Sequence, residues 1–317
     1  MLNNNLENDD EQNLLQNNFI LNNINLITTI KNNGKIIYCL KLLYDNRLAT
    51  GDYNSYLIIY NKNTLNQEII INNKLGGLLY IEQLKNKKIA ACFKENAIRI
   101  YSIDKDKYVI LQTIDYIHEN WVYKIIELSN NNLLSCSSDG SFVIWEYVGL
   151  HYEDIYKSNK EDYYILDIIE INDNEFVYNV GHSNADIVFF DILKKEKKEV
   201  LKNFELSYYI GTHFILMDNK MKLVIGGNKK IYILDVINYN ICEEINYNSI
   251  VTSVLKIDEN NFLIGYENGY INHYNLNESK LISVKKFFNE NIIYSILITN
   301  NKNLIIAADN YEIKIFH

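Results

Sequence analysis

The feature that most constrains the fold of this chain is an internal repeat of 40–45 residues. In each copy a large apolar residue closes the third of three short apolar segments. These residues are Tyr60, Tyr101, Trp145, Phe190, Leu234, Tyr274 and Phe316, and they are separated by 41, 44, 45, 44, 40 and 42 residues. A repeat of this length is one supersecondary unit that cannot bury its apolar face alone, so consecutive copies must pack against each other. The chain therefore favours a series of similar units over one irregular core.

The third copy, residues 121–147, shows the unit most clearly. An apolar segment over 122–128 is followed by a turn over 129–132 and a second segment over 133–137. A tight Ser138-Asp139-Gly140 turn then leads to a third segment that ends at Trp145. Alternating apolar and polar residues over runs of this length predict β-strands. The same order recurs in copies that begin near residues 36, 78 and 251, and weaker copies cover 165–191, 209–235 and 292–317.

The period and the third copy resemble the WD40-repeat family, whose repeats are about 40–45 residues long. His118, Ser135, Asp139 and Trp145 stand where that family places its His, its Ser or Thr, its Asp and its Trp. The dipeptide that follows the third strand survives as Phe190-Asp191 and Leu234-Asp235, and it has drifted in other copies. The resemblance covers about residues 24–317. It implies an all-β fold, a seven-bladed β-propeller of four-stranded antiparallel blades.

The two ends of the sequence predict how such a ring closes. The last copy stops at Phe316-His317, at the end of its third strand, so its blade lacks an outer strand. Upstream of the first copy, residues 24–30 (INLITTI) form an apolar segment that has no copy of its own. We expect this segment to pair antiparallel with 312–316, because that closes the ring and removes an open strand edge. The predicted organisation is a flexible, acidic, Asn-rich tail over 1–19 and a WD40-like propeller over 20–317.

Charge and cysteine usage narrow the expected partners and location. The 31 Lys and Arg residues against 40 Asp and Glu give a net charge of −9, which argues against binding nucleic acid or an anionic membrane. The sequence has no run of 18 apolar residues and no basic start followed by an apolar segment, so we expect neither a transmembrane helix nor a secretory signal. Cysteines at 39, 92, 136 and 242 form no CxxC pair and fit a reducing compartment. We therefore expect a cytoplasmic or nuclear protein.

One group of residues is similar in composition to a hydrolase triad. His118, Ser135 and Asp139 supply the three residue types, but no G-x-S-x-G turn presents the serine as a nucleophile. The WD40 resemblance implies instead a structural network in which His118 bridges Ser135 and Asp139, and Trp145 anchors its end. The six histidines lie at 118, 151, 182, 213, 273 and 317, and none has the spacing to another His or to a Cys that a zinc site requires. The sequence predicts no catalytic residue, metal or cofactor, and hence no enzyme.

The candidate partner-binding residues lie before the first strand of their copies, except Ser138, which lies in the turn after the second strand. In WD40 propellers this position faces one mouth of the central channel, and the resemblance places Ile36, Gly77, Trp121, Tyr164 and Ile250 there, with Tyr208 or Tyr209 near it in the fifth copy. Trp and Tyr are enriched at binding hot spots. The predicted partner-binding set is Trp121, Tyr164, Tyr208 and Ser138. The alternative is that Tyr is simply common in this chain and that these rings pack between blades.

These observations favour a non-catalytic protein–protein interaction scaffold, by analogy with propellers that present rigid faces and many loops. The alternative is an adaptor or substrate receptor that recognises a short peptide at one channel mouth, and the third hypothesis is a propeller enzyme. Aromatic side chains gathered at one mouth favour the receptor, whereas dispersed apolar strips along the rims of the blades favour the scaffold. Carboxylates and histidines that converge in the channel favour the enzyme. The expected partners are proteins or peptides, with no nucleic acid and no membrane.

Overall fold

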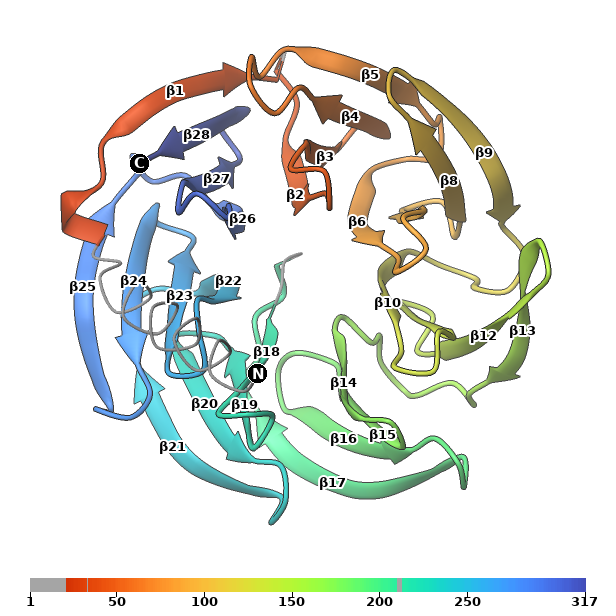
Figure 1. Ribbon diagram of the computed structural model, residues 1–317. Coiled ribbons are helices and arrows are strands. Elements are labelled where there is room, and N and C mark those ends of the chain that lie inside the picture. Colours follow the sequence, from red (N-terminus) through yellow and green to blue (C-terminus); the bar gives the residue numbers. More distant parts are fainter. Residues whose placement is uncertain (1–20, 33, 210–212) are drawn as a thin grey trace, which may run out of the picture.

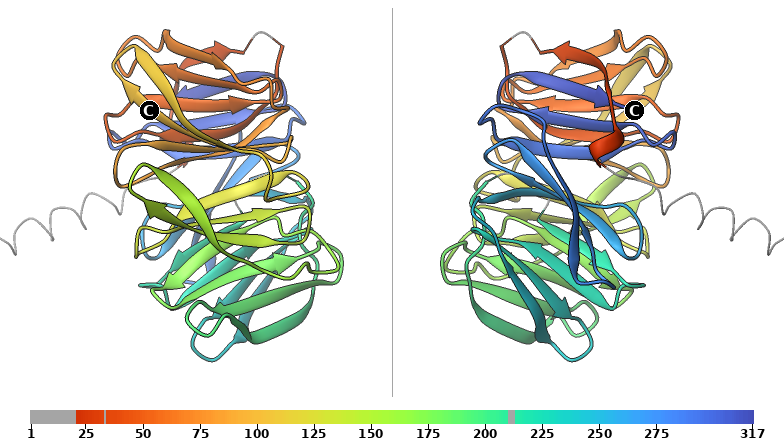
Figure 2. Two further views of the ribbon diagram at one scale, coloured as in Figure 1. Left: turned by 90° about the vertical axis from the view of Figure 1, so that its right-hand side faces the viewer. Right: turned by 90° about the vertical axis from the view of Figure 1, so that its left-hand side faces the viewer.

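The computed structural model describes residues 21–32, 34–209 and 213–317 and is an all-β propeller (Figure 1). In this part of the chain the strands form seven four-stranded antiparallel sheets around a central channel. The edge-on views show a ring that is wider than it is deep (Figure 2). The predicted fold class is therefore confirmed. The predicted tail over 1–19 lies outside the described residues.

Each blade is one sheet with its first strand at the channel and its last at the rim, and in blades 1 to 6 the four strands follow one another in chain order (Figure 1). The strands of blades 1 and 2 are β2 (Ile37–Leu42), β3 (Leu48–Asp52), β4 (Tyr56–Tyr60), β5 (Gln67–Asn72), β6 (Leu78–Gln83), β7 (Ile89–Phe93), β8 (Ile98–Asp104) and β9 (Lys107–Ile114). Those of blades 3 and 4 are β10 (Val122–Glu127), β11 (Leu133–Ser137), β12 (Phe142–Val148), β13 (His151–Lys157), β14 (Ile168–Asn172), β15 (Glu175–Val180), β16 (Ala185–Asp191) and β17 (Glu196–Phe204). Those of blades 5 and 6 are β18 (Phe214–Met217), β19 (Lys222–Gly226), β20 (Lys230–Asp235), β21 (Asn240–Asn246), β22 (Val251–Lys256), β23 (Asn261–Tyr266), β24 (Tyr270–Asn275) and β25 (Lys280–Lys286).

Blade 7 joins the two ends of the described chain. Its first three strands are β26 (Ile293–Ile298), β27 (Leu304–Ala308) and β28 (Glu312–Phe316), and its outer strand is β1 (Leu26–Lys31). β1 runs antiparallel to β28, with Leu26 opposite Phe316 and Lys31 opposite Glu312. The expected closure by an N-terminal strand is confirmed, with a strand that begins two residues later and ends one residue later than the apolar segment over 24–30. The short 3-10 helix η1 (Leu21–Asn23) precedes β1 and buries Leu21 against blades 6 and 7.

The apolar core is divided among the interfaces between blades. In the described part of the chain each of seven apolar clusters draws its residues from two neighbouring blades. Between blades 2 and 3, for example, Ala90 and Ile98 lie in one cluster with Val122, Val143 and Trp145. Second strands such as β7 and β11 are buried along their whole length, and in β7 every residue is apolar. Each blade therefore depends on its neighbours to bury its apolar faces.

A recurring backbone hydrogen bond defines one end of the ring. In each blade an amide at the end of the second strand donates to a carbonyl that precedes the first strand, so the segment before the first strand and the turn after the second lie together. The pairs are Tyr53 to Ile36, Lys94 to Gly77, Ser138 to Trp121, Gly181 to Tyr164, Gly226 to His213, Glu267 to Ile250 and Asp309 to Ile292, at 2.9–3.1 Å. We call this end of the blades the mouth end.

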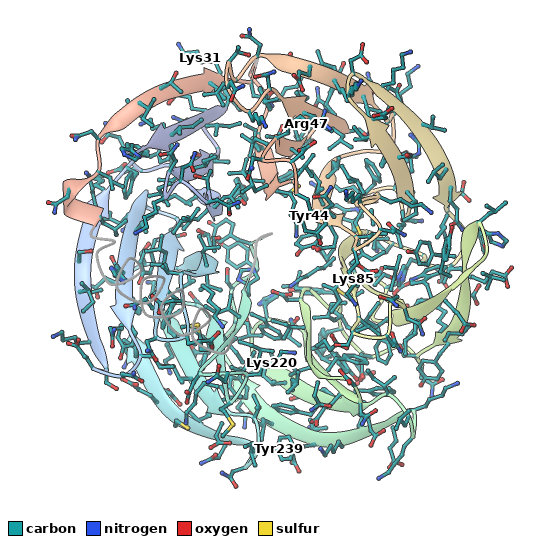
Figure 3. The ribbon with its side chains drawn as sticks, in the orientation of Figure 1. Lys31, Tyr44, Arg47, Lys85, Lys220 and Tyr239 are labelled. Atoms are coloured by element: carbon teal, nitrogen blue, oxygen red, sulfur yellow. The ribbon has the colours of Figure 1, made fainter. Side chains whose placement is uncertain are left out.

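The opposite end carries the turns between first and second strands, and we call it the turn end. Here a polar side chain of one blade caps the turn of the preceding blade. Glu127 accepts from the amide of Lys85 at 2.6 Å, and Glu170 accepts from the amide of Ser129 at 2.9 Å. Gln83 and Glu259 make the same kind of contact to Tyr44 and Asn219. Figure 3 shows Tyr44 and Lys85 near the central opening, whereas Tyr239 lies at the outer edge.

Candidate functional site

The side chains of His118, Ser135, Asp139 and Trp145 form one hydrogen-bonded chain in blade 3. The indole Nε1 of Trp145 donates to Ser135 Oγ at 2.9 Å, and Ser135 Oγ lies 2.8 Å from His118 Nε2. The other ring nitrogen, His118 Nδ1, lies 3.4 Å from Asp139 Oδ2. Ser141 joins the network, since its hydroxyl donates to Asp139 Oδ1 at 2.6 Å. This arrangement ties the turn after β11 to the segment before β10 and to the third strand.

The same network lowers the pKa of the Asp139 carboxyl. Burial alone would raise the pKa of Asp139, but hydrogen bonds from His118, Ser141 and the amide of Glu119 outweigh burial and hold that pKa well below its ordinary value. Ser135 is 0 % exposed, and its hydroxyl is already engaged by His118 and Trp145. A nucleophile must be reached by its substrate, so this geometry suits a structural role better than hydrolysis.

The corresponding residues of other blades are connected differently. In blade 2 the hydroxyl of Tyr101, the counterpart of Trp145, donates to Asn73 Oδ1 at 2.5 Å, and Arg99 donates to the same oxygen at 2.8 Å. In blade 1 the counterparts of Ser135 and Trp145 are Thr50 and Tyr60, and the buried Tyr60 hydroxyl lies near Thr50 and Gln67 instead of a histidine. The hydrogen-bonded network of these four residues is thus a feature of blade 3 that blades 1 and 2 do not share.

All four residues of the predicted partner-binding set lie at the mouth end. Trp121 is 38 % exposed and Tyr208 is 54 % exposed, whereas Tyr164 and Ser138 are half-buried. The Ser138 hydroxyl is buried and has no hydrogen-bond partner in the described part of the chain. In blade 5 the position before the first strand is taken by His213, because β18 starts only at Phe214, and Tyr208 lies five residues upstream.

Trp121, Tyr164 and Tyr208 are part of a larger set of rings that we call the aromatic belt. The belt consists of the rings of Tyr294, Tyr38, Tyr53, Trp121, Tyr123, Tyr164, His182, Tyr208 and Tyr209, together with the side chains of Lys94 and Glu267 that contact them. Neighbouring ring centroids in the arc from Trp121 to Tyr209 are 4.5–6.4 Å apart, within the range of favourable aromatic pairs.

The belt touches every blade. Tyr294 of blade 7 packs edge-on against Tyr38 of blade 1 at 5.4 Å. Lys94 of blade 2 joins this pair to Trp121 of blade 3, with its Nζ 4.7 Å from the Tyr38 centroid and 4.5 Å from the Trp121 centroid. At the far end of the arc, the Tyr209 hydroxyl of blade 5 donates to Glu267 Oε2 of blade 6 at 3.1 Å. The rings therefore follow the channel entrance instead of being spread over the surface.

The sequence analysis missed several belt residues that occupy an equivalent place in their blades. In blade 3 the predicted residue Ser138 directly follows the second strand. The same position holds Tyr53 in blade 1, Lys94 in blade 2 and Glu267 in blade 6, and His182 follows it by one residue in blade 4. Comparing this position across all copies is the signal that would have found them.

Behind the belt lies a channel cavity of about 250 Å³. Residues from all seven blades line it, among them the belt residues Tyr38, Tyr123, Tyr209 and Tyr294. Its walls are largely apolar, and inner side chains reach towards the central opening in Figure 3. The belt is therefore the entrance to a concave site, which is where ligands usually bind.

A buried ion pair that the sequence analysis did not identify holds three blades together beside this cavity. Lys124 Nζ of blade 3 lies 2.5 Å from Asp167 Oδ1 of blade 4, and both side chains are buried. Asp167 Oδ2 also accepts from the amides of His213 and Phe214 of blade 5, at 2.8 and 3.0 Å. The His213 ring is buried, and desolvation lowers its pKa. This carboxylate thus serves as a shared acceptor at the junction of blades 3, 4 and 5.

Among the residues that the structure describes, no group of three or more His, Cys, Asp or Glu side chains is arranged to hold a metal ion. Within the same ranges, no helix has the length and apolar character needed to cross a membrane. In comparisons with known proteins, no family model and no curated protein matches the sequence.

Proposed function

We propose that this chain is a non-catalytic protein-interaction propeller, similar to WD40 proteins, that binds an extended segment of a partner protein at its mouth end. The observation that carries this proposal is the aromatic belt at the entrance to the channel cavity. Exposed Trp and Tyr side chains held by rigid strands supply large contact areas at a low cost in conformational entropy. Of the hypotheses drawn from the sequence, the belt favours a receptor for a peptide segment.

The geometry of blade 3 supports a non-catalytic function. The three residues that are similar in composition to a hydrolase triad belong to a buried network, in which the Ser135 hydroxyl contacts His118 and Trp145. The cavity lysines Lys41, Lys124 and Lys256 each lie against a carboxylate, at 2.9, 2.5 and 2.5 Å. These groups are paired in the manner of structural ion pairs and do not converge on one reacting centre.

Binding measurements on belt variants test the proposed site. Trp121→Ala and Tyr164→Ala should each weaken a partner by about 1–4 kcal/mol while the protein melts close to the wild type. Partners are recovered on the wild-type protein, identified by mass spectrometry, and titrated against each variant by calorimetry. Tyr44→Ala, an exposed tyrosine of the turn end, is the matched control and should leave binding unchanged. If both belt variants unfold more easily and every partner still binds, the rings only pack between blades.

A second candidate surface lies on the rim of blade 2 and corresponds to the scaffold hypothesis. On the outer strand β9, Tyr108, Val109, Ile110 and Leu111 are all exposed, at 40–58 %. An outer strand has an open edge, and charged residues normally discourage pairing there. β17 and β25 carry several lysines, whereas β9 has a single lysine, at its first residue. Val109→Lys should therefore abolish binding of any partner that docks on this rim and should spare partners of the belt.

A further inference from the structure

Lys94 occupies an unusual position in the aromatic belt. It follows β7 directly, and its Nζ lies 4.7, 5.1 and 4.5 Å from the ring centroids of Tyr38, Tyr53 and Trp121. The same nitrogen donates to the Tyr38 hydroxyl at 2.9 Å. The ammonium group is thus enclosed by rings from blades 1 and 3, which partly replace its lost hydration through cation–π attraction.

Lys94 forms no ion pair with any residue in the described part of the chain. The lysines that line the channel cavity behind it, Lys41, Lys124 and Lys256, all lie against a carboxylate of the protein. Desolvation lowers the pKa of Lys94, and no carboxylate contributes to that shift. Lys94 is therefore a partly desolvated cation in the belt, and no carboxylate in the described part of the chain pairs with it. A bound partner can supply that carboxylate.

Gly77 allows Lys94 to reach this place. Gly77 occupies in blade 2 the position that Trp121 occupies in blade 3, before the first strand. A Cβ atom on Gly77 would lie 3.0 Å from Tyr38 Cε2 and 3.3 Å from Lys94 Cδ, so a side chain there would press on both. The absence of a side chain at this one position lets the lysine cross from its own blade to the ring of Tyr38.

We propose that Lys94 anchors a carboxylate of the bound partner segment, with Tyr53 and Trp121 packing against the neighbouring apolar part of that segment. This inference rests on the proposed function of the belt. The ligand chemistry is a single peptide carboxylate, which either an Asp or Glu side chain or a free C-terminus supplies. Lys94 donates to the Tyr38 hydroxyl, and burial raises the pKa of Tyr38, so the phenol keeps its own proton and can donate it to the carboxylate.

The charges of the protein favour a single carboxylate as the ligand over a phosphate or a run of acidic residues. A phosphate group carries about 1.5–2 negative charges and is usually met by a cluster of arginines, whereas Lys94 is one ammonium group. The belt also contains Glu267, and the whole chain has a net charge of −9, which opposes a strongly acidic segment. The segment that fits is mostly apolar and carries one negative group.

Peptide libraries measure this preference directly. We would use random nonapeptides with Glu, Gln or phosphoserine fixed at the centre and an amidated C-terminus, and a fourth set with Gln at the centre and a free C-terminal carboxylate. Enriched peptides are titrated by fluorescence anisotropy against the wild type, Lys94→Met and Lys94→Arg. The control is Lys88→Met, since Lys88 makes the same kind of contact to Tyr147 at the turn end, with Nζ 4.5 Å from the ring centroid.

The wild type should enrich the central-Glu set, the free-carboxylate set or both over the Gln set, and the enriched set identifies the source of the carboxylate. Lys94→Met should raise Kd about 10- to 100-fold, because a hydrogen bond to a charged group is lost, while Lys94→Arg and Lys88→Met should stay near the wild type. Peptides that depend on Trp121 but bind equally well to Lys94→Met, or a preference for phosphoserine, would overturn the carboxylate anchor and leave the proposed function standing. If no peptide from any of the libraries binds more tightly to the wild type than to Trp121→Ala, both proposals fail.

Discussion

Individual buried polar side chains connect segments of this ring that are not joined by the hydrogen bonds between strands. Asp139 is one of them, and its carboxylate is stabilised by His118, Ser141 and the Glu119 amide. Its folded-state pKa lies below the ordinary value, so its contribution to stability is present above about pH 4 and is lost as the pH falls towards that lower pKa. Asp139→Asn should therefore be less stable than the wild type at neutral pH, and the difference should narrow below about pH 4. Urea unfolding at a series of pH values between about 3 and 7 measures this difference in stability. The exposed Asp115→Asn variant is the control.

Trp145 and Ser135 test the rest of the same network. Trp145→Ala should lower the free energy of unfolding by about 3–5 kcal/mol, because loss of the fully buried ring leaves a cavity between blades 2 and 3.

Ser135→Ala should lower the free energy of unfolding by about 1–3 kcal/mol, because His118 and Trp145 lose a hydrogen-bond partner. Denaturant unfolding of both variants gives the values. A hydrolytic turnover that disappears in folded Ser135→Ala would replace the structural interpretation with a catalytic one.

The Lys124–Asp167 pair predicts an asymmetry between its two members. In Lys124→Met the Asp167 carboxylate keeps the amides of Ile168, His213 and Phe214 as donors. In Asp167→Leu the buried ammonium group and these amides all lose their acceptor, which should cost about 3–5 kcal/mol. We expect Lys124→Met to be the milder change in thermal and urea unfolding. Equal losses in the two variants would mean that the backbone donors contribute little.

At the scale of elements, the strand β1 determines whether the ring is closed. β1 pairs with β28 from Leu26 to Lys31 with one bulge at Ile27, and the Asn25 and His317 backbones exchange hydrogen bonds of 2.8 and 3.0 Å just beyond it. Deleting residues 1–31 removes this pairing and the Leu21 contact, so it should lower the melting temperature and promote aggregation through the open edge of β28.

Deletion of residues 1–19 is the control for this prediction, because it keeps all described contacts of β1. Thermal melts, light scattering and limited proteolysis compare the two truncations with the full chain. Equal stability of the two would show that β1 is dispensable for closure.

At the scale of the whole molecule, the distribution of apolar contacts predicts cooperative unfolding. Each of the seven clusters in the described residues belongs to two blades, so the loss of one blade exposes apolar surface on both neighbours. The full chain should unfold in one calorimetric transition whose van't Hoff and calorimetric enthalpies agree. A peptide that spans only blade 3, residues 121–157, should show no dispersed NMR spectrum. A folded isolated blade, or several separate transitions, would contradict this account.

Much of the architecture could be predicted because each blade is a local unit. A hairpin depends on residues close together in the sequence, so alternation and turn residues locate strands such as β10 and β11 within a residue or two. The WD40 resemblance predicts the network of blade 3, whose four residues lie close together in the sequence between His118 and Trp145. The fifth copy was harder to align, because β18 has only four residues and begins after His213.

The sequence by itself determined the repeat, the number of blades, the segment that closes the ring and the residues of the blade 3 network. Only the tertiary structure decided which side chains meet across blades: Lys94 with Tyr38 and Trp121, and Lys124 with Asp167. These partners lie 27–56 residues apart, on sheets whose relative twist and tilt depend on packing around the entire ring. A strand pattern specifies which face a side chain occupies within its sheet. It does not specify which residue of the neighbouring sheet that side chain will contact, because that depends on how all the blades close together.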